Sequence, residues 1–161
     1  MRRPVIELID EVAKESRCSP NHPCISAVTI GSTMDMSILR ELFSNVARAA
    51  QILDISDDPV PVQALESMKK FPPYRTGRFG QLQEWYEDYE ECTPGMSHTS
   101  HMYPVYPGGL ITETGTPELF EAARRSLERR LLHAKRQGGW PGSWKISLMA
   151  RFKIRWNAGI S

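Results

Sequence analysis

Apolar residues recur at three- and four-residue steps in separate stretches of this 161-residue chain, a pattern typical of helices with one apolar face. The longest stretch predicts a helix over residues 33–54. Ser32 is placed to cap it, and Asp35 falls in its first turn, where the helix dipole favours a negative charge. The apolar stripe of this helix consists of Leu39, Leu42, Phe43, Val46, Ala50 and Leu53.

A second helix is predicted over residues 61–70, entered through Asp57 or Asp58 and the following Pro59. Because the connection to the first helix is short, the two are expected to form an antiparallel hairpin. A short amphipathic helix is also predicted near the amino terminus, over residues 3–16.

The last third of the chain predicts two more helices. One spans residues 116–136, with Thr116 as its cap and Pro117 at its first helical position. The other spans residues 141–152 and follows a pair of glycines. The buried face of the longer helix is expected to consist of Leu119, Phe120, Ala123, Leu127 and Leu131.

The segment over residues 74–114 is rich in aromatic residues, glycine and proline and has little periodicity. Only residues 81–89 fit a short helix. A connection of this length usually displays functional groups on a rigid scaffold. Since neither strand pairs with hairpin turns nor βαβ units are found in the sequence, the predicted class is all-α, with antiparallel helical hairpins and one long aromatic loop.

Composition and charge exclude several classes of protein. Lys and Arg total 20 against 19 Asp and Glu, and no run of like charges could follow a phosphate backbone, so nucleic-acid binding is disfavoured. With 40% hydrophobic and 24% charged residues the chain resembles ordinary globular proteins. The apolar stretch near the amino terminus predicts neither an export signal nor a membrane span, because it is interrupted by Glu7, Asp10 and Glu11.

The segment over residues 78–89 concentrates amides, carboxylates and aromatic rings within a dozen positions. Such mixtures recognise sugars, whose C–H faces pack on aromatic rings and whose hydroxyls need donors and acceptors. The alternative is a partly buried aromatic helix whose acidic residues are merely solvated.

Three cysteines, Cys18, Cys24 and Cys92, are too few and too unevenly spaced for a disulfide framework, so reduced thiols in the cytoplasm are expected. On a helix, His98 and His101 would share one face, where with Cys92 they could bind a metal. A nucleophilic pair of Cys92 and His98 is a further alternative. No phosphate-binding loop or serine elbow is present in the sequence, and no cofactor or resident metal is expected.

These segments carry a set of motifs that occur in a fixed order. They read TMDM at 33–36, ILRELF at 38–43, RFGQLQEW at 78–85, ED at 87–88, SHTSHMY at 97–103, YPG at 106–108, IT at 111–112, GTPEL at 115–119, AARRSLER at 122–129, GW at 139–140, WKI at 144–146 and AR at 150–151. In this order the motifs, over roughly residues 20–152, resemble glycoside hydrolase family 95, the inverting α-L-fucosidases and their relatives.

The resemblance implies part of an (α/α)6 barrel, in which helical hairpins surround a sugar pocket. It divides the chain into an N-terminal helix over 1–19, a partial catalytic domain over 20–152 and an unmatched tail over 153–161. It also implies a fucosylated glycan as ligand. The substrate-binding residues carried over from the family are His98, His101, Gln81, Glu84, Trp85, Trp140 and Lys145.

The family pattern also implies which catalytic groups are missing. Inverting hydrolysis needs a carboxylic acid and a basic group about 6.5 to 9.5 Å apart. Asn21 stands near the position of the family's general acid, and the family's water-activating Asp has no counterpart here. We therefore expect no catalytic residue in this chain and an inactive segment. The carboxylates to test first are Glu84, Glu87, Asp88 and Glu113.

Two alternatives to an inactive glycosidase segment stay open. The chain could be a sugar-binding remnant, or one part of a split enzyme completed by another polypeptide. Exposed barrel edges would leave apolar helix faces uncovered, so self-association or a partner chain is expected.

Overall fold

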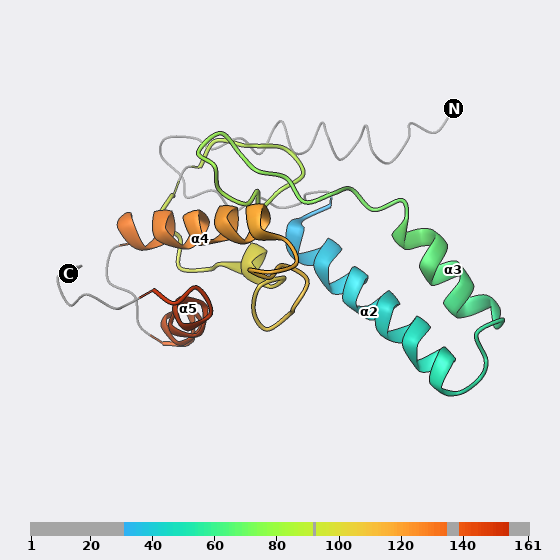
Figure 1. Cartoon of the computed structure of the whole chain (residues 1–161). Helices are drawn as coiled ribbons and strands as arrows, with labels where there is room; N and C mark the ends of the chain where they lie inside the picture. Colours follow the sequence, from blue (N-terminus) through green and yellow to red (C-terminus); the bar gives the residue numbers. More distant parts are fainter. Residues whose placement is uncertain (1–30, 92, 135–138, 155–161) are drawn as a thin grey trace, which may run out of the picture.

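The computed structural model describes residues 31–91, 93–134 and 139–154, and the regular secondary structure within these ranges is helical (Figure 1). The helices are α2 Thr33–Ile52, α3 Pro59–Met68, the 3-10 helix η1 Ser100–Met102, α4 Pro117–Leu132 and α5 Trp140–Arg151. Within these ranges the structure contains no strand, only an isolated antiparallel bridge between Thr76 and Leu82. The all-α class is confirmed. None of the described helices combines the length and apolar character that crossing a membrane requires.

Some predictions lie outside the described residues. They are the helix over 3–16, the position of Asn21, and the three cysteines. The domain boundaries near residues 20 and 152 and the partial barrel stay predictions.

Helix α2 begins as the sequence predicts. The Ser32 hydroxyl oxygen accepts a hydrogen bond from the Asp35 amide at 3.1 Å, which satisfies one of the free amides of the first turn. At the other end the helix stops at Ile52, two residues before the predicted boundary, and Asp54 takes a left-handed backbone with φ 57°. Thr33 also ties α2 to the aromatic segment, since its hydroxyl donates to the Gln83 carbonyl at 2.5 Å.

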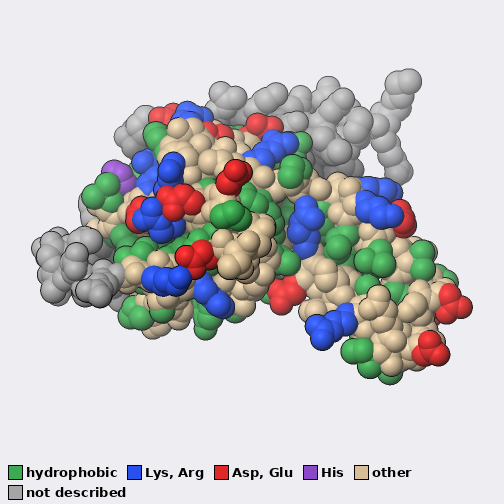
Figure 2. Space-filling view, viewed as in Figure 1, with side chains coloured by type: hydrophobic (Ala, Val, Ile, Leu, Met, Phe, Trp, Pro, Cys, Tyr) green, Lys and Arg blue, Asp and Glu red, His purple; other side chains and the backbone are tan. Residues whose placement is uncertain are grey.

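Helix α3 returns along α2, so the predicted hairpin is confirmed (Figure 1). It begins at Pro59 rather than residue 61, and Asp58 caps it by accepting from the Val60 amide at 2.8 Å. Its buried residues are Pro61 and Ala64. The small buried residues of the hairpin allow close approach of the helices, and larger apolar side chains remain on its surface (Figure 2).

The hydrophobic core lies between α4, α5 and the irregular segment that precedes α4. Its buried members are Leu82, Met102, Val105, Ile111, Ala122, Ala123, Leu127, Leu148, Met149 and Phe152. The predicted inner face of α4 is confirmed, because Ala123 and Leu127 are fully buried and the remaining members pack against this core. Thr116 stands at the N-cap of α4, but its hydroxyl bonds backward to Thr112 instead of to helix amides. The helix ends at Leu132, four residues before the predicted boundary.

The predicted short helix over residues 81–89 is wrong. The chain instead makes a tight turn, in which the Gly77 amide donates to the Gln81 carbonyl at 2.8 Å and Gly80 has φ 73°. A side chain at residue 77 would meet the ends of the Gln81 and Asp88 side chains at 2.3 and 2.6 Å, so these two side chains would have to move, and the φ of Gly80 is one that favours glycine. The two glycines and their local partners therefore override the weak helical pattern.

The turn is fixed to α4 by its backbone. The Leu82 amide donates to the Ala122 carbonyl at 3.0 Å, and the Ser126 hydroxyl donates to the Leu82 carbonyl at 3.2 Å. Leu82 itself is 1% exposed. The backbone of Leu82 therefore has a fixed position on the core, and this position determines where the residues after it lie.

Leu127 gives a direct test of this core. Because its side chain is completely buried between α4 and its neighbours, Leu127→Ala is expected to lower the free energy of unfolding by about 2–5 kcal/mol. Urea denaturation followed by circular dichroism measures the change. The control is Leu132→Ala on the same helix, where the side chain is 76% exposed and a change within about 0.5 kcal/mol is expected. Equal effects of the two substitutions would contradict the core assignment.

Candidate functional site

A partly buried carboxylate joins three elements of the fold. Glu84 lies two residues after the fixed point at Leu82, and its Oε2 accepts from Arg130 Nη2 of α4 at 2.7 Å. Its Oε1 accepts from the hydroxyl of Ser100, the first residue of η1, at 3.3 Å. The same carboxylate lies 3.6 Å from Nδ1 of His101. We call Glu84, Ser100, His101, Arg130 and Lys145 the buried polar cluster.

Arg130 holds this cluster together. Its side chain is 7% exposed, and besides Glu84 it donates from Nη1 to the carbonyls of Thr93 and Pro94, each at 3.2 Å. These bonds satisfy a buried charge and two backbone acceptors at once. The sequence prediction missed Arg130. The available signal was its place on the inner face of α4, three residues after the fully buried Leu127.

His101 is neutral at physiological pH. Burial lowers its pKa below the usual 6.5, and the attraction of Glu84 does not offset this. Its Nδ1 has no hydrogen-bond partner among the described residues. A buried imidazole nitrogen next to a carboxylate is a polar group that a hydroxyl could satisfy.

Lys145 brings a second cation to the cluster from α5. Its side chain is 3% exposed, and burial together with the charge of Arg130 lowers its pKa to about 8. The lysine thus loses its proton more readily than an exposed one does, because a neighbouring arginine keeps its charge at any accessible pH.

Two more predicted residues lie in an exposed group of rings. The His98 and Trp140 ring centroids are 5.2 Å apart, and those of Trp140 and Trp144 are 5.9 Å apart. Trp140 is 59% exposed and His98 is exposed as well. Trp144 is anchored by its indole N–H, which donates to the Tyr106 carbonyl at 3.0 Å. We call His98, Trp140 and Trp144 the aromatic ridge.

The ridge continues into an open groove beside Trp144. Its lining includes aromatic rings and hydroxyl groups, both of which a sugar-binding surface needs. The lining residues are Tyr103, Tyr106, Pro107, Ser143, Trp144 and Ser147.

Gln81 has a structural position in the turn. Its Oε1 accepts from the Phe79 amide at 2.9 Å and its Nε2 donates to Asp88 Oδ1 at 3.2 Å. Asp88 also accepts from Arg78, and although burial acts to raise its pKa, these bonds hold the pKa below its usual value. The amide of Gln81 is therefore used within the protein.

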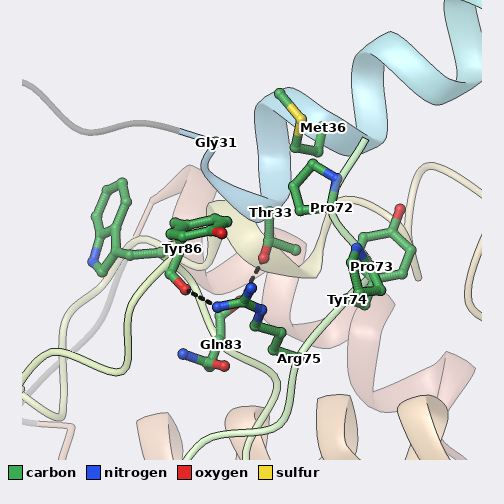
Figure 3. A pocket seen from close by; sticks show the side chains of 10 residues that line it. Gly31, Thr33, Met36, Pro72, Pro73, Tyr74, Arg75, Gln83 and Tyr86 are labelled. Atoms are coloured by element: carbon green, nitrogen blue, oxygen red, sulfur yellow. Dashed lines mark hydrogen bonds between the residues drawn. The ribbon is translucent and has the colours of Figure 1, made fainter. Parts of the chain in front are cut away.

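Trp85 lines a different and much smaller cavity, between the start of α2 and the segment at residues 72–75. Its volume is about 20 Å³, room for about one water molecule. Figure 3 shows Arg75 crossing this cavity to the Tyr86 carbonyl, which it reaches at 3.1 Å. This cavity is too small for a sugar.

The seven predicted residues thus occupy four places. Glu84, His101 and Lys145 belong to the buried polar cluster, His98 and Trp140 to the aromatic ridge, and Gln81 and Trp85 lie elsewhere. The two histidines differ because η1 begins at Ser100, after His98, so the helical spacing that would put them on one face is not realised. The described residues contain no group of three or more His, Cys, Asp or Glu able to hold a metal.

Comparison with known proteins decides the family. The protein-family model described as glycosyl hydrolase family 95 catalytic domain matches residues 9–159 of this sequence. The chain belongs to glycoside hydrolase family 95. It is 33% identical to alpha-L-fucosidase 2 of Arabidopsis thaliana over 126 residues, which are 78% of this chain and 15% of that protein. It is 27% identical to probable alpha-fucosidase A of Aspergillus niger over 144 residues, 84% of this chain and 18% of the relative. The family 95 chain therefore spans less than a fifth of the length of either relative.

The ion pair of the buried polar cluster is testable in this family 95 chain. Glu84→Gln leaves Arg130 without its carboxylate in a buried place, and the expected loss is roughly 3 kcal/mol of unfolding free energy. Arg124→Gln is the control, because Arg124 pairs with Glu121 and Glu128 where all three side chains are more than a third exposed. Its loss should stay below about 1 kcal/mol. Equal losses in chemical denaturation would contradict the role given to Glu84.

His101 predicts a pH dependence of stability. The unfolded chain, with a histidine pKa near 6.5, takes up a proton that the folded chain resists, so the free energy of unfolding should fall as the pH drops below about 6.5. The contribution is at most about 1.4 kcal/mol per pH unit. His101→Asn should flatten the dependence in urea titrations between pH 7.5 and 5.5, whereas His133→Asn, at an exposed position, should leave it unchanged. An unaltered slope in His101→Asn would contradict the burial effect.

Proposed function

We propose that this chain forms part of the sugar-binding pocket of a family 95 glycosidase catalytic domain acting on terminal α-L-fucosyl or related residues. Membership of the family and the fucosidase names of two relatives support this. The observation that carries the proposal is the aromatic ridge, where the exposed ring of Trp140 stacks on Trp144 and contacts His98 at a tilt. The partial (α/α)6 barrel implied by the resemblance belongs to the same proposal.

The exposed and buried residues have different roles in this proposal. Trp140 offers a flat apolar surface to the C–H face of a sugar, and the His98 imidazole offers a donor and an acceptor to its hydroxyls. Glu84 is partly buried and Lys145 is buried, so both are less accessible to a sugar than the rings of the ridge are. His101 belongs to the same cluster, and its buried Nδ1 has no hydrogen-bond partner among the described residues.

We further propose that the chain alone does not hydrolyse glycosides. A general acid must hold a proton, but the candidate carboxylates interact with cations: Glu84 with Arg130 and Asp88 with Arg78. Glu113 pairs with Lys153 at the exposed surface. Three of the four candidate carboxylates are therefore engaged in ion pairs within the protein, and for Asp88 the contacts with Arg78 and Gln81 hold the pKa below its usual value although burial acts to raise it.

A sugar-binding module without catalysis is the second candidate. It is favoured by the same pairing of carboxylates together with the exposed ring of Trp140. Hydrolysis restored by adding a polypeptide with the rest of a family 95 domain would instead favour a split enzyme.

The test combines turnover and binding. The purified chain is expected to release no aryl group from an aryl α-L-fucoside, and to bind L-fucose weakly, because an open surface offers few contacts per sugar. Trp140→Ala should weaken this binding by roughly 3- to 10-fold in titrations followed by nuclear magnetic resonance. Tyr89→Ala, at a 42% exposed ring elsewhere, is the control and should leave the affinity unchanged.

Two results would contradict these proposals separately. Turnover like that of complete family enzymes would place catalytic residues in this chain, with Glu84→Gln the first variant to assay. An affinity for L-fucose that is the same in Trp140→Ala would remove the aromatic ridge as the binding surface.

A further inference from the structure

The open groove beside the aromatic ridge shares Trp144 with it. The groove has a volume of about 510 Å³, within the range of small-molecule binding sites. Because Trp144 stacks on Trp140 and also lines the groove, a ligand on the ring of Trp140 has the groove beside it. We call this surface the side groove, and its lining residues are Tyr103, Tyr106, Pro107, Ser143, Trp144 and Ser147.

Hydrogen bonds within the protein fix the shape of the side groove. On one side the chain forms a turn over residues 103–108, in which the Gly108 amide donates to the Tyr103 carbonyl at 2.9 Å. A Cβ at Gly108 would meet this carbonyl oxygen at 2.7 Å, so the turn has no room for a side chain there. On the other side Trp144 joins α5 to the turn through its bond to the Tyr106 carbonyl. A surface formed in advance loses less entropy when a ligand binds.

The hydroxyl proton of Tyr103 is already used within the protein. The hydroxyl donates to Glu41 Oε2 of α2 at 2.7 Å. This bond, together with burial and the charge of Glu41, raises the pKa of Tyr103, so the phenol stays protonated at physiological pH. A hydroxyl has one proton and two lone pairs. A ligand group that reaches the Tyr103 oxygen must therefore be a donor.

Ser147 offers a second oxygen of the same kind. Its hydroxyl donates to the Ser143 carbonyl at 3.3 Å, which leaves lone pairs on its oxygen for a ligand. Charges of both signs stand near the groove, since Glu41 binds Tyr103 and the Arg151 guanidinium lies 5.7 Å from the Tyr106 ring centroid. Rings, acceptor oxygens and charges of opposite sign together favour a neutral ligand that carries several hydroxyls.

We propose that the side groove binds the sugar unit next to the fucosyl residue, and that Tyr103 selects a neutral sugar whose hydroxyl donates to its oxygen. The inference rests on the proposed function, because a fucosyl residue on Trp140 brings the next unit to the groove. Trp144 and Tyr106 offer apolar surface to the C–H face of that unit. Tyr103 is thus a specificity-determining residue, and Glu41 is a positioning residue that acts through it.

Titrations of the full 161-residue chain, followed by nuclear magnetic resonance, test for the second sugar unit. The reference probe is methyl α-L-fucoside. The other probes are disaccharides that attach L-fucose in α linkage to each hydroxyl of D-glucose or D-galactose in turn. We expect at least one disaccharide to bind roughly 3- to 10-fold more tightly than the reference, because its second ring gains an aromatic contact. Equal or weaker binding of every disaccharide would overturn the proposal.

Tyr103→Phe tests the acceptor oxygen, since it removes the hydroxyl and keeps the ring. The affinity for the tightest disaccharide should fall by roughly 2- to 10-fold, the effect of one lost hydrogen bond, and that for methyl α-L-fucoside should stay the same. The matched control is Tyr89→Phe, the same change at a ring that is 42% exposed and outside the groove lining. It should alter neither affinity. Circular dichroism checks that each variant folds.

Two substitutions of Glu41 test its positioning role. Glu41→Ala leaves the Tyr103 hydroxyl without its acceptor, so the affinity for the disaccharide should fall as in Tyr103→Phe. Glu41→Gln keeps an oxygen that can accept from Tyr103 and should restore most of the affinity. The affinity for methyl α-L-fucoside should stay the same in both variants. Equal affinities of the two variants for the disaccharide would remove the role given to Glu41.

Failure of this inference differs from failure of the proposed function. Trp140→Ala that weakens the binding of L-fucose, with an unchanged disaccharide affinity in Tyr103→Phe, would overturn the side groove and keep the aromatic ridge. Tyr103→Phe that weakens the binding of both probes equally would also overturn the selective role of Tyr103. A chain that binds neither methyl α-L-fucoside nor any disaccharide would overturn both proposals.

Discussion

The structure around the site depends on how α4 holds the irregular segment before it. A segment without regular hydrogen-bond ladders must find partners for each buried backbone group. Arg130 supplies two of them, at the carbonyls of Thr93 and Pro94, while its charge meets Glu84. Ala122 and Ser126 of the same helix bind the backbone of Leu82. One face of α4 thus supplies hydrogen-bond partners to backbone groups of the irregular segment, as a neighbouring strand would in a sheet.

This arrangement determines the protonation states nearby. Burial and the charge of Arg130 both lower the pKa of the two other basic groups in the cluster. Lys145 has a pKa of about 8, and His101 stays neutral. Glu84 is the acceptor that these groups surround, and its hydrogen bonds are used for structure. Both carboxylate oxygens of Glu84 are therefore used in attaching the loop to α4 and η1.

The helices could be predicted from the sequence because their signals are local. Ser32, Asp35 and the stripe of α2 lie within one stretch of chain, as do the cap and inner face of α4. The conformation of the aromatic segment could not be predicted, because its partners are distant in the sequence. Arg130 contacts residues that are 36 to 46 positions away. The weak helical pattern after Gln81 does not form a helix, because the turn at Gly77 and these long-range bonds determine the backbone there.

The same limit applies to the candidate site. The sequence analysis selected seven substrate-binding candidates, and three of them meet around Arg130. Whether each candidate is buried or exposed could not be predicted from the spacing of the residues. His98 and His101 differ only in the point at which η1 begins. Spacing gives the neighbours of a side chain only once the secondary structure between them is known.

Polar contacts at its base fix the position of the α2–α3 hairpin. Ser37 contacts the Tyr74 hydroxyl at 2.9 Å, Arg40 donates to the Pro72 carbonyl at 2.7 Å, and the Tyr103 hydroxyl donates to Glu41 at 2.7 Å. Such directional bonds set an angle without using the large apolar side chains. Those side chains remain on the outside, where covering them gains burial and disturbs no existing core contact. The position of the α2–α3 hairpin therefore depends on these bonds at its base, whereas the aromatic ridge depends on the core between α4 and α5.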